Sequence, residues 1–225
     1  MLRAIIFDFD GVIANSEPLH FRAYRDILAE EGIALTEASY YADYLGFDDV
    51  GAFAAVAAAH QRTWNAAQIA NLVARKAVVL EGLERNVSVL FPGAADAVRR
   101  AAARMPVAIA SGARGEEIRR LLAREGLLGC FTAIIAAEDA PVSKPAPDPY
   151  LRALARLAPA LGDRLRASDC IAIEDSHWGL ESARAAGLRT VAVTNTYPAS
   201  ELSADLIIDS LRAIDLDRLA RLCSQ

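Results

Sequence analysis

The sequence predicts an α/β protein built on a doubly wound parallel sheet, with an all-helical domain inserted after the first strand. An apolar run typical of a β-strand begins at Ala4, and from residue 91 onward short apolar runs alternate with helical patterns. Between residues 16 and 90 the periodicity is helical throughout. Strands that alternate with helices are typical of crossover units, which place helices on both faces of a parallel sheet.

The predicted helical domain is inserted at one point of the sheet domain, so the chain passes between the two domains twice. Residues 1–15 and 91–225 are expected to form the sheet domain, and residues 16–90 the helical domain. An inserted domain with two connections can move as a hinged body, so it is a candidate cap domain. Its predicted helices are His20–Glu31, Gly51–His60 and Ala66–Leu80.

The sheet domain contains residues that commonly begin and end helices. Asp148 before Pro149 is typical of a helix N-terminus, and Gly126 and Gly187 are typical of residues that follow a helix. The predicted helices are Ala94–Arg104, Glu116–Glu125, Pro149–Leu157 and Trp178–Ala186. After the first strand, the predicted strands are Val107–Ser111, Ala133–Ala137, Cys170–Glu174, Thr190–Asn195 and Leu206–Ile208.

The composition argues against several classes of function. The formal net charge is −5 and the pI is near 5.3, whereas a nucleic-acid surface normally needs a basic stripe. No apolar stretch is long enough to span a bilayer, and the first residues lack the pattern of a secretion signal. We therefore expect a cytoplasmic protein that binds neither nucleic acid nor membranes. The three widely spaced cysteines are expected to be reduced thiols.

Two acidic residues, Asp8 and Asp10, follow the first apolar run and precede Gly11, which permits a sharp turn. Alternation along a strand would point both carboxylates to one face, where they attract a cation or act as nucleophile and proton carrier. Taken alone, this short pattern is also typical of a solvated acidic turn.

Further polar residues follow other predicted strands. Ser111 and Gly112 follow one strand, Glu174 and Asp175 end another, and Lys144 lies in a loop beside a proline. Taken singly, each has an ordinary alternative, such as a helix cap or a surface lysine. In an open parallel sheet, however, ligands bind at the carboxyl ends of the strands, so these residues are expected to converge.

The convergent set has the chemistry of a phosphate and metal site. Four carboxylates at one edge require a cation, and ligands that are all oxygen suit Mg²⁺. The hydroxyl of Ser111 and nearby backbone N–H groups are suited to phosphate oxygens. Lys144 would neutralise charge between a carboxylate nucleophile and an incoming phosphate.

Four ordered motifs resemble those of the haloacid dehalogenase superfamily, in its phosphatase and phosphomutase branch with a helical cap. Covering the predicted sheet domain, they imply a Rossmann-like catalytic core. The motifs are Asp8-Phe9-Asp10-Gly11-Val12, Ser111-Gly112, Lys144 within Ser-Lys-Pro-Ala-Pro-Asp, and Ile173-Glu174-Asp175-Ser176-His177-Trp178-Gly179.

The resemblance implies a role for each motif residue. Asp8 would attack phosphorus to form an aspartyl-phosphate, and Asp10 would protonate the leaving alcohol and then deprotonate the water that releases phosphate. Mg²⁺ would be held by Asp8, the backbone carbonyl of Asp10 and Asp175, with Glu174 ligating directly or through water. Phosphate oxygens would be bound by Ser111, Gly112 and Lys144.

The insertion carries the candidate substrate residues. His20, which is equally typical of a polar helix surface, resembles a gating histidine of β-phosphoglucomutases, and Arg75-Lys76 resembles a basic pair in their caps. Where those mutases carry an arginine for a second phosphate, this chain reads Leu45-Gly46-Phe47-Asp48-Asp49. A carboxylate at Asp49 would repel a second phosphate.

The favoured prediction is therefore a Mg²⁺-dependent phosphatase of a small phosphorylated metabolite, a sugar or polyol phosphate. The alternatives are a β-phosphoglucomutase-like hexose-phosphate mutase and a non-catalytic module that binds phosphometabolites. Because a cap would cover the site without a partner subunit, a monomer is expected.

Overall fold

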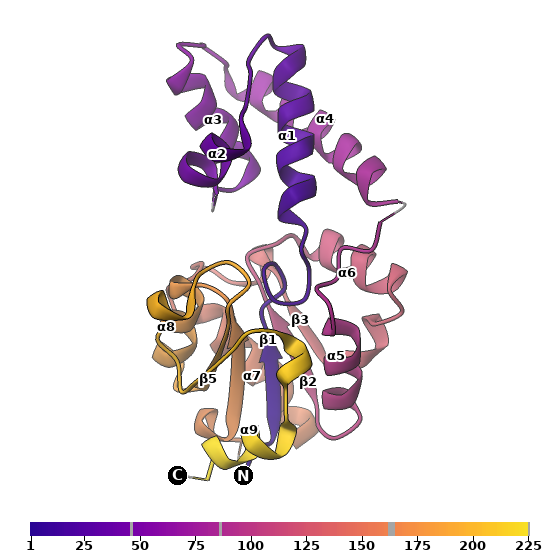
Figure 1. Cartoon of the computed structure of the whole chain (residues 1–225), viewed down its shortest axis with the longest axis vertical. Helices are drawn as coiled ribbons and strands as arrows, with labels where there is room; N and C mark the ends of the chain where they lie inside the picture. The colour runs from indigo at the N-terminus through magenta and orange to yellow at the C-terminus, as the bar shows by residue number, and fades with distance from the viewer. Residues whose placement is uncertain (46, 86, 162–164, 225) are drawn as a thin grey trace. The chain divides into compact units, whose positions relative to one another are not determined.

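The computed structural model describes residues 1–45, 47–85, 87–161 and 165–224. Within these residues, six strands form one parallel sheet in the order β3-β2-β1-β4-β5-β6 (Figure 1). The fold class predicted from the sequence is therefore confirmed. The strands are β1 (Ala4–Phe7), β2 (Val107–Ala110), β3 (Ala133–Ile135), β4 (Cys170–Glu174), β5 (Arg189–Val193) and β6 (Leu206–Ile208).

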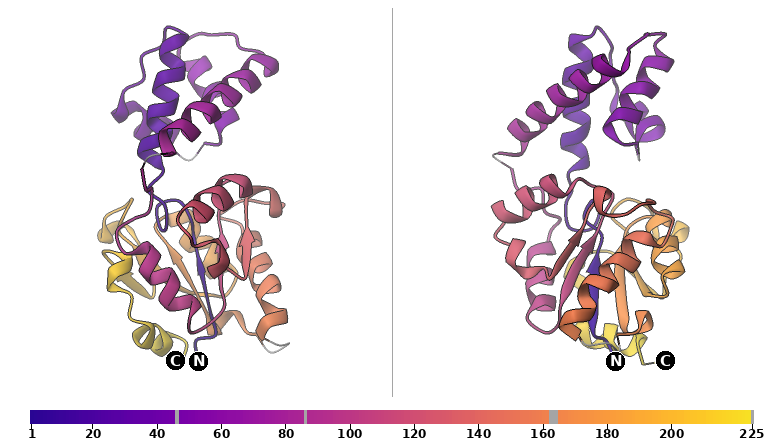
Figure 2. Two further views of the ribbon diagram at one scale, coloured as in Figure 1. Left: turned by 90° about the vertical axis from the view of Figure 1, so that its right-hand side faces the viewer. Right: turned by 180° about the vertical axis from the view of Figure 1, so that it is seen from behind.

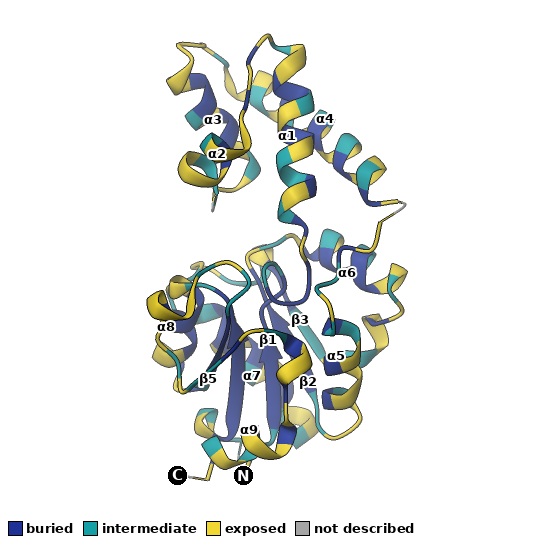
Figure 3. Cartoon of the chain, viewed as in Figure 1, coloured by how far each residue is buried: buried dark blue, intermediate teal, exposed yellow. Residues whose placement is uncertain are grey.

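Helices cover both faces of the sheet. The helices α7 and α8 share one buried cluster with Ala4 and Ile6 of β1, and α5 lies on the opposite face (Figures 1 and 2). The four residues of β1, all apolar, are fully buried, as are those of β2 and β4 (Figure 3). The helices of this unit are α5 (Ala94–Ala102), α6 (Gly115–Arg124), α7 (Asp148–Leu161), α8 (His177–Ala185) and α9 (Leu216–Leu222).

The helices and strands begin and end within a few residues of the predicted positions, with two informative differences. The first strand ends at Phe7, so Asp8 and Asp10 both lie beyond it, and strand alternation does not set their directions. The C-terminal helix α9 was not predicted from periodicity. Its N-terminus is capped by Asp215, whose side chain accepts the backbone N–H groups of Asp217 and Arg218.

The chain divides into two compact units, one of Met1–Asn15 with Val89–Gln225 and one of Ser16–Ser88. The second boundary lies two residues before the predicted one. The described residues of the inserted unit contain helices and no strand, as α1 (Glu17–Glu30), α2 (Glu37–Ser39), the π-helical turn η1 (Tyr40–Tyr44), α3 (Asp49–Ala59) and α4 (Ala66–Glu84).

The inserted unit has its own hydrophobic core. Tyr24 packs against Tyr40 and Phe53 with ring centroids 5.6 and 5.1 Å apart. Aliphatic residues from α1, α3 and α4 complete the cluster, among them Ile27, Leu28, Val56 and Leu72. The unit therefore does not depend on the sheet for its apolar core.

The two connections to the insertion are paired within the sheet unit. The N–H of Asn15 donates to the carbonyl of Val89 at 2.6 Å, and Ala14 pairs with Leu90 in an antiparallel bridge. The inserted segment therefore leaves and re-enters the sheet unit at adjacent positions. The chain termini also lie together, because the amino group of Met1 donates to the carbonyl of Cys223 at 3.1 Å (Figure 2).

None of the described helices combines the length and the hydropathy that crossing a bilayer requires.

Candidate active site

The predicted strand-end residues emerge from the adjacent strands β1 and β4. Phe7 pairs with Ile173, and the N–H of Asp8 donates to the carbonyl of Ile173 at 2.9 Å. Asp8 therefore leaves the sheet beside Glu174, the last residue of β4. Strand order reverses between β1 and β4, and ligand sites of open parallel sheets form at the carboxyl edge of such a point.

Three carboxylates meet at this edge. Asp8, Glu174 and Asp175 each offer an oxygen within 4.8 Å of the other two, and the residues are only 7%, 0% and 5% exposed. Buried carboxylates this close repel one another, so the set suits a hard cation such as Mg²⁺. Among the described residues, the Asp10 side chain is not part of this group, and its predicted metal contact through the backbone carbonyl stays a prediction.

The turn after Asp10 is closely packed against Asp175. Gly11 has a φ of +77°, and a Cβ at this position would lie 1.9 Å from Asp175 Oδ2. The Asn195 side chain donates to the carbonyl of Gly11 at 2.7 Å, and the Thr196 hydroxyl donates to Asp175 Oδ2. Asn195 and Thr196 were not predicted as site residues, although polar residues at the end of an apolar strand are the pattern that predicted Ser111, Glu174 and Asp175.

Lys144 links the two strands of the site. Its ammonium donates to Asp8 Oδ1 at 2.7 Å and to Glu174 Oε1 at 2.6 Å, and its side chain is 14% exposed. Burial opposes the charge of Lys144, but the carboxylates of Asp8 and Glu174 outweigh that effect and raise its pKa. The loop that carries Lys144 is tied to α8, because the buried Ser182 hydroxyl donates to the carbonyl of Ala146 at 2.6 Å. Lys144 is therefore held as a cation between two carboxylates.

The carboxylates of the site are difficult to ionise together. Burial raises the pKa of Asp8 well above its usual value against the opposing effect of Lys144, and Glu174 and Asp175 raise it further. Burial, followed by repulsion from Glu174, raises the pKa of Asp175 to about 7. A cation that bound here would favour the ionised forms.

Tyr150 is a member of the site that sequence reasoning missed. Its hydroxyl donates to Glu174 Oε1 at 2.7 Å, and its ring centroid is 5.3 Å from Lys144 Nζ. Burial, followed by the charges of Glu174 and Asp8, raises the pKa of Tyr150 well above its usual value, so the hydroxyl keeps its proton. In the sequence, Tyr150 is one of several apolar positions on the helix that follows Pro149, a pattern that indicates only core packing.

Ser111 and Gly112 follow β2, the neighbour of β1 on the other side from β4. The Ser111 hydroxyl oxygen is buried and accepts the N–H of Ala113 at 3.0 Å, while Gly112 is exposed. The pair therefore forms a tight turn at the same edge of the sheet. Its contact with phosphate stays a prediction.

In the inserted unit, three of the predicted substrate residues lie together. Lys76, 1% exposed, donates to Asp49 Oδ1 at 2.7 Å and lies 3.0 Å from His20 Nδ1. The Tyr24 hydroxyl also donates to Asp49 Oδ1, at 2.6 Å. Burial acts to raise the pKa of Asp49, but Lys76 outweighs it and the pKa is lowered. Gly46, the fourth predicted residue, lies outside the described residues.

Lysine is used sparingly in this chain. The sequence has 24 lysines and arginines together, and Lys76 and Lys144 are the two lysines among them. Both make ion pairs in the interior of their units. A lysine supplies a compact point charge, whereas the planar guanidinium of an arginine requires more room.

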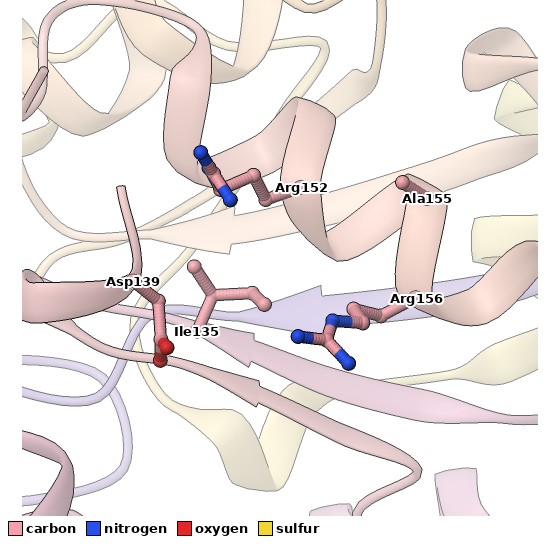
Figure 4. A pocket seen from close by; sticks show the side chains of 5 residues that line it. All are labelled: Ile135, Asp139, Arg152, Ala155 and Arg156. Carbon is pink, nitrogen blue, oxygen red and sulfur yellow. The ribbon is translucent and has the colours of Figure 1, made fainter. Parts of the chain in front are cut away.

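A small cavity of about 100 Å³ lies beside β3 and α7 (Figure 4). Arg152 and Arg156 of α7 line it together with Asp139, Ile135 and Ala155. None of the predicted site residues is among those five.

Comparison with known proteins places the site in a family. The sequence profile of the haloacid dehalogenase-like hydrolases matches residues 2–187, a range that includes the three clustered carboxylates, Lys144 and Tyr150. The chain therefore belongs to the haloacid dehalogenase-like hydrolase family. Within that family it is a phosphatase, in agreement with relatives that bear this name.

Two of these relatives are from Escherichia coli (strain K12). Fructose-1-phosphate phosphatase YqaB is 30% identical over 199 residues, which cover 84% of this chain and 95% of that protein. Hexitol phosphatase B is 31% identical over 211 residues, which cover 90% of this chain and 86% of that protein. Among solved structures, CbbY from Rhodobacter sphaeroides in complex with phosphate aligns with a TM-score of 0.80 at 28% identity, covering 95% and 96% of the two chains.

Proposed function

We propose that this phosphatase hydrolyses a small phosphorylated sugar or polyol, with Mg²⁺ as cofactor and with an aspartyl-phosphate formed on Asp8. The observation that carries the proposal is the ammonium of Lys144 held at 2.7 Å from Asp8 Oδ1. A carboxylate oriented by a buried cation at a strand end is suited to attack a phosphorus atom that brings further negative charge.

The reaction would take place in two displacements. An oxygen of Asp8 attacks phosphorus, the ester bond to the leaving oxygen breaks, and Asp10 donates a proton to that oxygen. Asp10 then accepts a proton from water as the water oxygen attacks the phosphorus of the aspartyl-phosphate, which releases inorganic phosphate and restores Asp8. Lys144 stays beside Asp8 throughout and offsets the negative charge of the phosphoryl group.

The donor set of the site fits Mg²⁺. Asp8 and Asp175 would hold it with the backbone carbonyl of Asp10, and Glu174 completes the acidic group. When bound, Mg²⁺ would supply positive charge that keeps the carboxylates ionised and offsets charge on the phosphoryl group.

The substrate class is inferred from the relatives and from the inserted unit. YqaB and hexitol phosphatase B are named for a ketose phosphate and for hexitol phosphates. In this chain Lys76 is already paired with Asp49, so these two residues form a neutralised ion pair beside the His20 imidazole. We infer a substrate with one phosphate and several hydroxyl groups, contacted by His20, Gly46 and Asp49, with the buried Lys76 acting through its ion pair with Asp49.

The test is phosphate release by the full chain from fructose 1-phosphate, sorbitol 6-phosphate and glucose 6-phosphate, with Mg²⁺ or with EDTA. We expect release that requires Mg²⁺ and that falls on the order of a thousandfold or more in Asp8→Asn. Asp96→Asn, at an exposed position of α5 in the same unit, is the matched control and should retain full activity. Equal activity in Asp8→Asn would rule out the aspartyl-phosphate.

The second candidate is a β-phosphoglucomutase-like mutase, which the contact between His20 and Lys76 favours. The same assay separates the two activities. A mutase primed with glucose 1,6-bisphosphate would interconvert glucose 1-phosphate and glucose 6-phosphate without net release of phosphate. A protein that did neither would be a binding module.

A further inference from the structure

The Glu174 carboxylate is fully engaged by donors from the protein itself. Oε1 accepts hydrogen bonds from Lys144 Nζ at 2.6 Å and from the Tyr150 hydroxyl at 2.7 Å. Oε2 lies 3.2 Å from the N–H of Asp175 and 3.3 Å from the hydroxyl of Ser176, and both donate to it. A carboxylate offers about four acceptor positions, so the four donors use the whole capacity of Glu174.

The surroundings of Glu174 prevent it from turning toward another partner. It is 0% exposed, and a Cβ at Gly179 would lie about 2 Å from each of its carboxyl atoms. The first turn of α8 therefore covers the carboxylate with backbone at close contact. By contrast, the four hydrogen bonds to Glu174 leave carboxylate oxygens of Asp8 and Asp175 for a metal ion.

Tyr150 is placed in a way that core packing alone does not require. The residue is 0% exposed, in the cluster formed by β1, β2, β4, α7 and α8, where a phenylalanine would bury the same ring. A hydroxyl in such surroundings costs free energy unless it is hydrogen-bonded. Here the hydroxyl reaches Glu174 while the face of the ring approaches Lys144, so a single side chain contacts both partners of the ion pair.

We propose that Tyr150 is a positioning residue, which acts through Glu174 to keep the Lys144 ammonium in place beside Asp8. Glu174 then serves the site as the acceptor that orients Lys144 and not as a direct ligand of the metal. The proposal rests on the proposed function for its effect on catalysis, because Asp8 is the nucleophile there. The arrangement of Tyr150, Glu174 and Lys144 can be tested without any substrate.

The test compares Tyr150→Phe with the native chain and with Tyr40→Phe. Tyr40 donates a hydrogen bond to Glu17 inside the inserted unit, so its variant also loses a partly buried bond between tyrosine and carboxylate, but far along the chain from Lys144. In Tyr150→Phe we expect kcat for p-nitrophenyl phosphate to fall about tenfold, which corresponds to about 1.4 kcal/mol. KM and the Mg²⁺ Kd, measured by calorimetry, should stay within about twofold.

Lysine ammonium NMR gives a readout independent of activity. Because the chain has two lysines, protein labelled with ¹⁵N-lysine yields at most two side-chain signals, assigned with Lys76→Arg. In Tyr150→Phe the hydrogen exchange of the Lys144 ammonium should speed up at least about fivefold, while that of Lys76 is unchanged. Tyr40→Phe should leave the Lys144 signal as it is.

Three results would overturn the proposal. In the first, Tyr150→Phe lowers the melting temperature as Tyr40→Phe does and leaves both kcat and the Lys144 signal unchanged, so the tyrosine is only structural. In the second, the Mg²⁺ Kd rises tenfold or more with normal exchange at Lys144, so the effect passes through the metal. In the third, kcat falls while the Lys144 signal is unchanged, so Tyr150 affects catalysis by a route other than the position of Lys144. A native chain without phosphatase activity would instead refute the proposed function and leave the NMR test intact.

Discussion

Asp8 and Asp175 couple the stability of the protein to pH and to divalent cations. The pKa of Asp175 is about 7 in the folded protein, against an ordinary value of 3.8, and that of Asp8 is raised in the same direction. The folded chain therefore binds more protons than the unfolded chain between these values. The stability contributed by the protonated carboxyls is fully present below pH 3.8 and is lost as the pH rises through 7.

In EDTA, which removes divalent cations, the melting temperature of the protein should fall from pH 5 to pH 8, by on the order of 5 °C. Mg²⁺ should restore more stability at pH 8 than at pH 5, because it binds the ionised carboxylates. Differential scanning calorimetry measures both effects, and Asp175→Asn should flatten the pH dependence. A melting temperature that rose from pH 5 to pH 8 in EDTA would contradict the raised pKa values.

Gly179, like Gly11, is a position at which the site has no room for a side chain. A Cβ there would lie about 2 Å from the Glu174 carboxyl atoms, so Gly179→Ala has to displace either the buried carboxylate or the first turn of α8. We expect the free energy of unfolding to fall by about 3 kcal/mol and phosphatase activity to be lost. Chemical denaturation and phosphate release measure the two effects.

The control for this substitution is Gly82→Ala, also within a helix. Gly82 lies in α4, and apart from its chain neighbours and the backbone of its own helix a Cβ there would have no atom within 4 Å. Because alanine is the better helix former, Gly82→Ala should stabilise the chain by about 0.5–1 kcal/mol. If both variants had the same stability as the native chain, the packing described for Gly179 would be wrong.

At the scale of elements, α4 shows what local sequence can specify. Asn65 accepts the N–H of Gln68 at 3.0 Å, and the Gln68 side chain accepts the N–H of Asn65 at 2.9 Å. This reciprocal pair fixes the start of the helix at Ala66, where periodicity also predicted it. The helix ends four residues later than predicted, at Glu84, which is itself buried although it is charged.

Asn65→Ala should therefore destabilise the inserted unit by about 1 kcal/mol, since it removes an acceptor for the first turn of α4. Asn71→Ala is the matched control in the same helix, at an exposed position away from the cap. It should be neutral or slightly stabilising, because alanine has the higher helix propensity. Urea denaturation followed by circular dichroism distinguishes the two, and equal effects would show that the cap carries no stability.

The elements also show which part of the site the sequence could predict. Asp8, Glu174 and Asp175 could be found because each ends or follows a strand that the apolar pattern marks, and Lys144 because it lies beside a proline in the loop after another such strand. Tyr150 could not, because its hydroxyl bonds to a residue 24 positions away and its sequence pattern is that of an ordinary core residue.

The pairing of Asp49 with Lys76 is a second feature that could not be predicted from the sequence, because it depends on how whole elements pack. The sequence indicated a carboxylate that would repel a second phosphate and a lysine in a basic pair, but not that the two side chains neutralise each other. Their ion pair joins α3 to α4 at 2.7 Å across 27 positions, and the packing of the inserted unit decides it. Charge at single positions was therefore predictable, whereas the net charge offered to a substrate was not.

The division into two units supports one prediction about the whole chain. The segment Ser16–Ser88 has its own core and leaves the sheet unit between hydrogen-bonded neighbours, Asn15 and Val89. A short Gly-Ser linker can therefore replace it without stretching the chain, and closing so short a loop costs little entropy. The shortened protein should unfold in one cooperative transition. It should also show a single lysine ammonium signal, from Lys144, with the exchange rate of the native chain.

The same shortened protein separates the roles of the two units in catalysis. If the sheet unit contains the complete carboxylate and lysine site, it should still hydrolyse p-nitrophenyl phosphate in the presence of Mg²⁺. It should lose the ability to discriminate between sugar phosphates, because His20, Asp49 and Lys76 are gone. A shortened protein that folds and keeps the native order of kcat/KM among fructose 1-phosphate, sorbitol 6-phosphate and glucose 6-phosphate would show that specificity resides in the sheet unit. One in which the Lys144 signal is lost would show instead that the insertion helps to hold the site together.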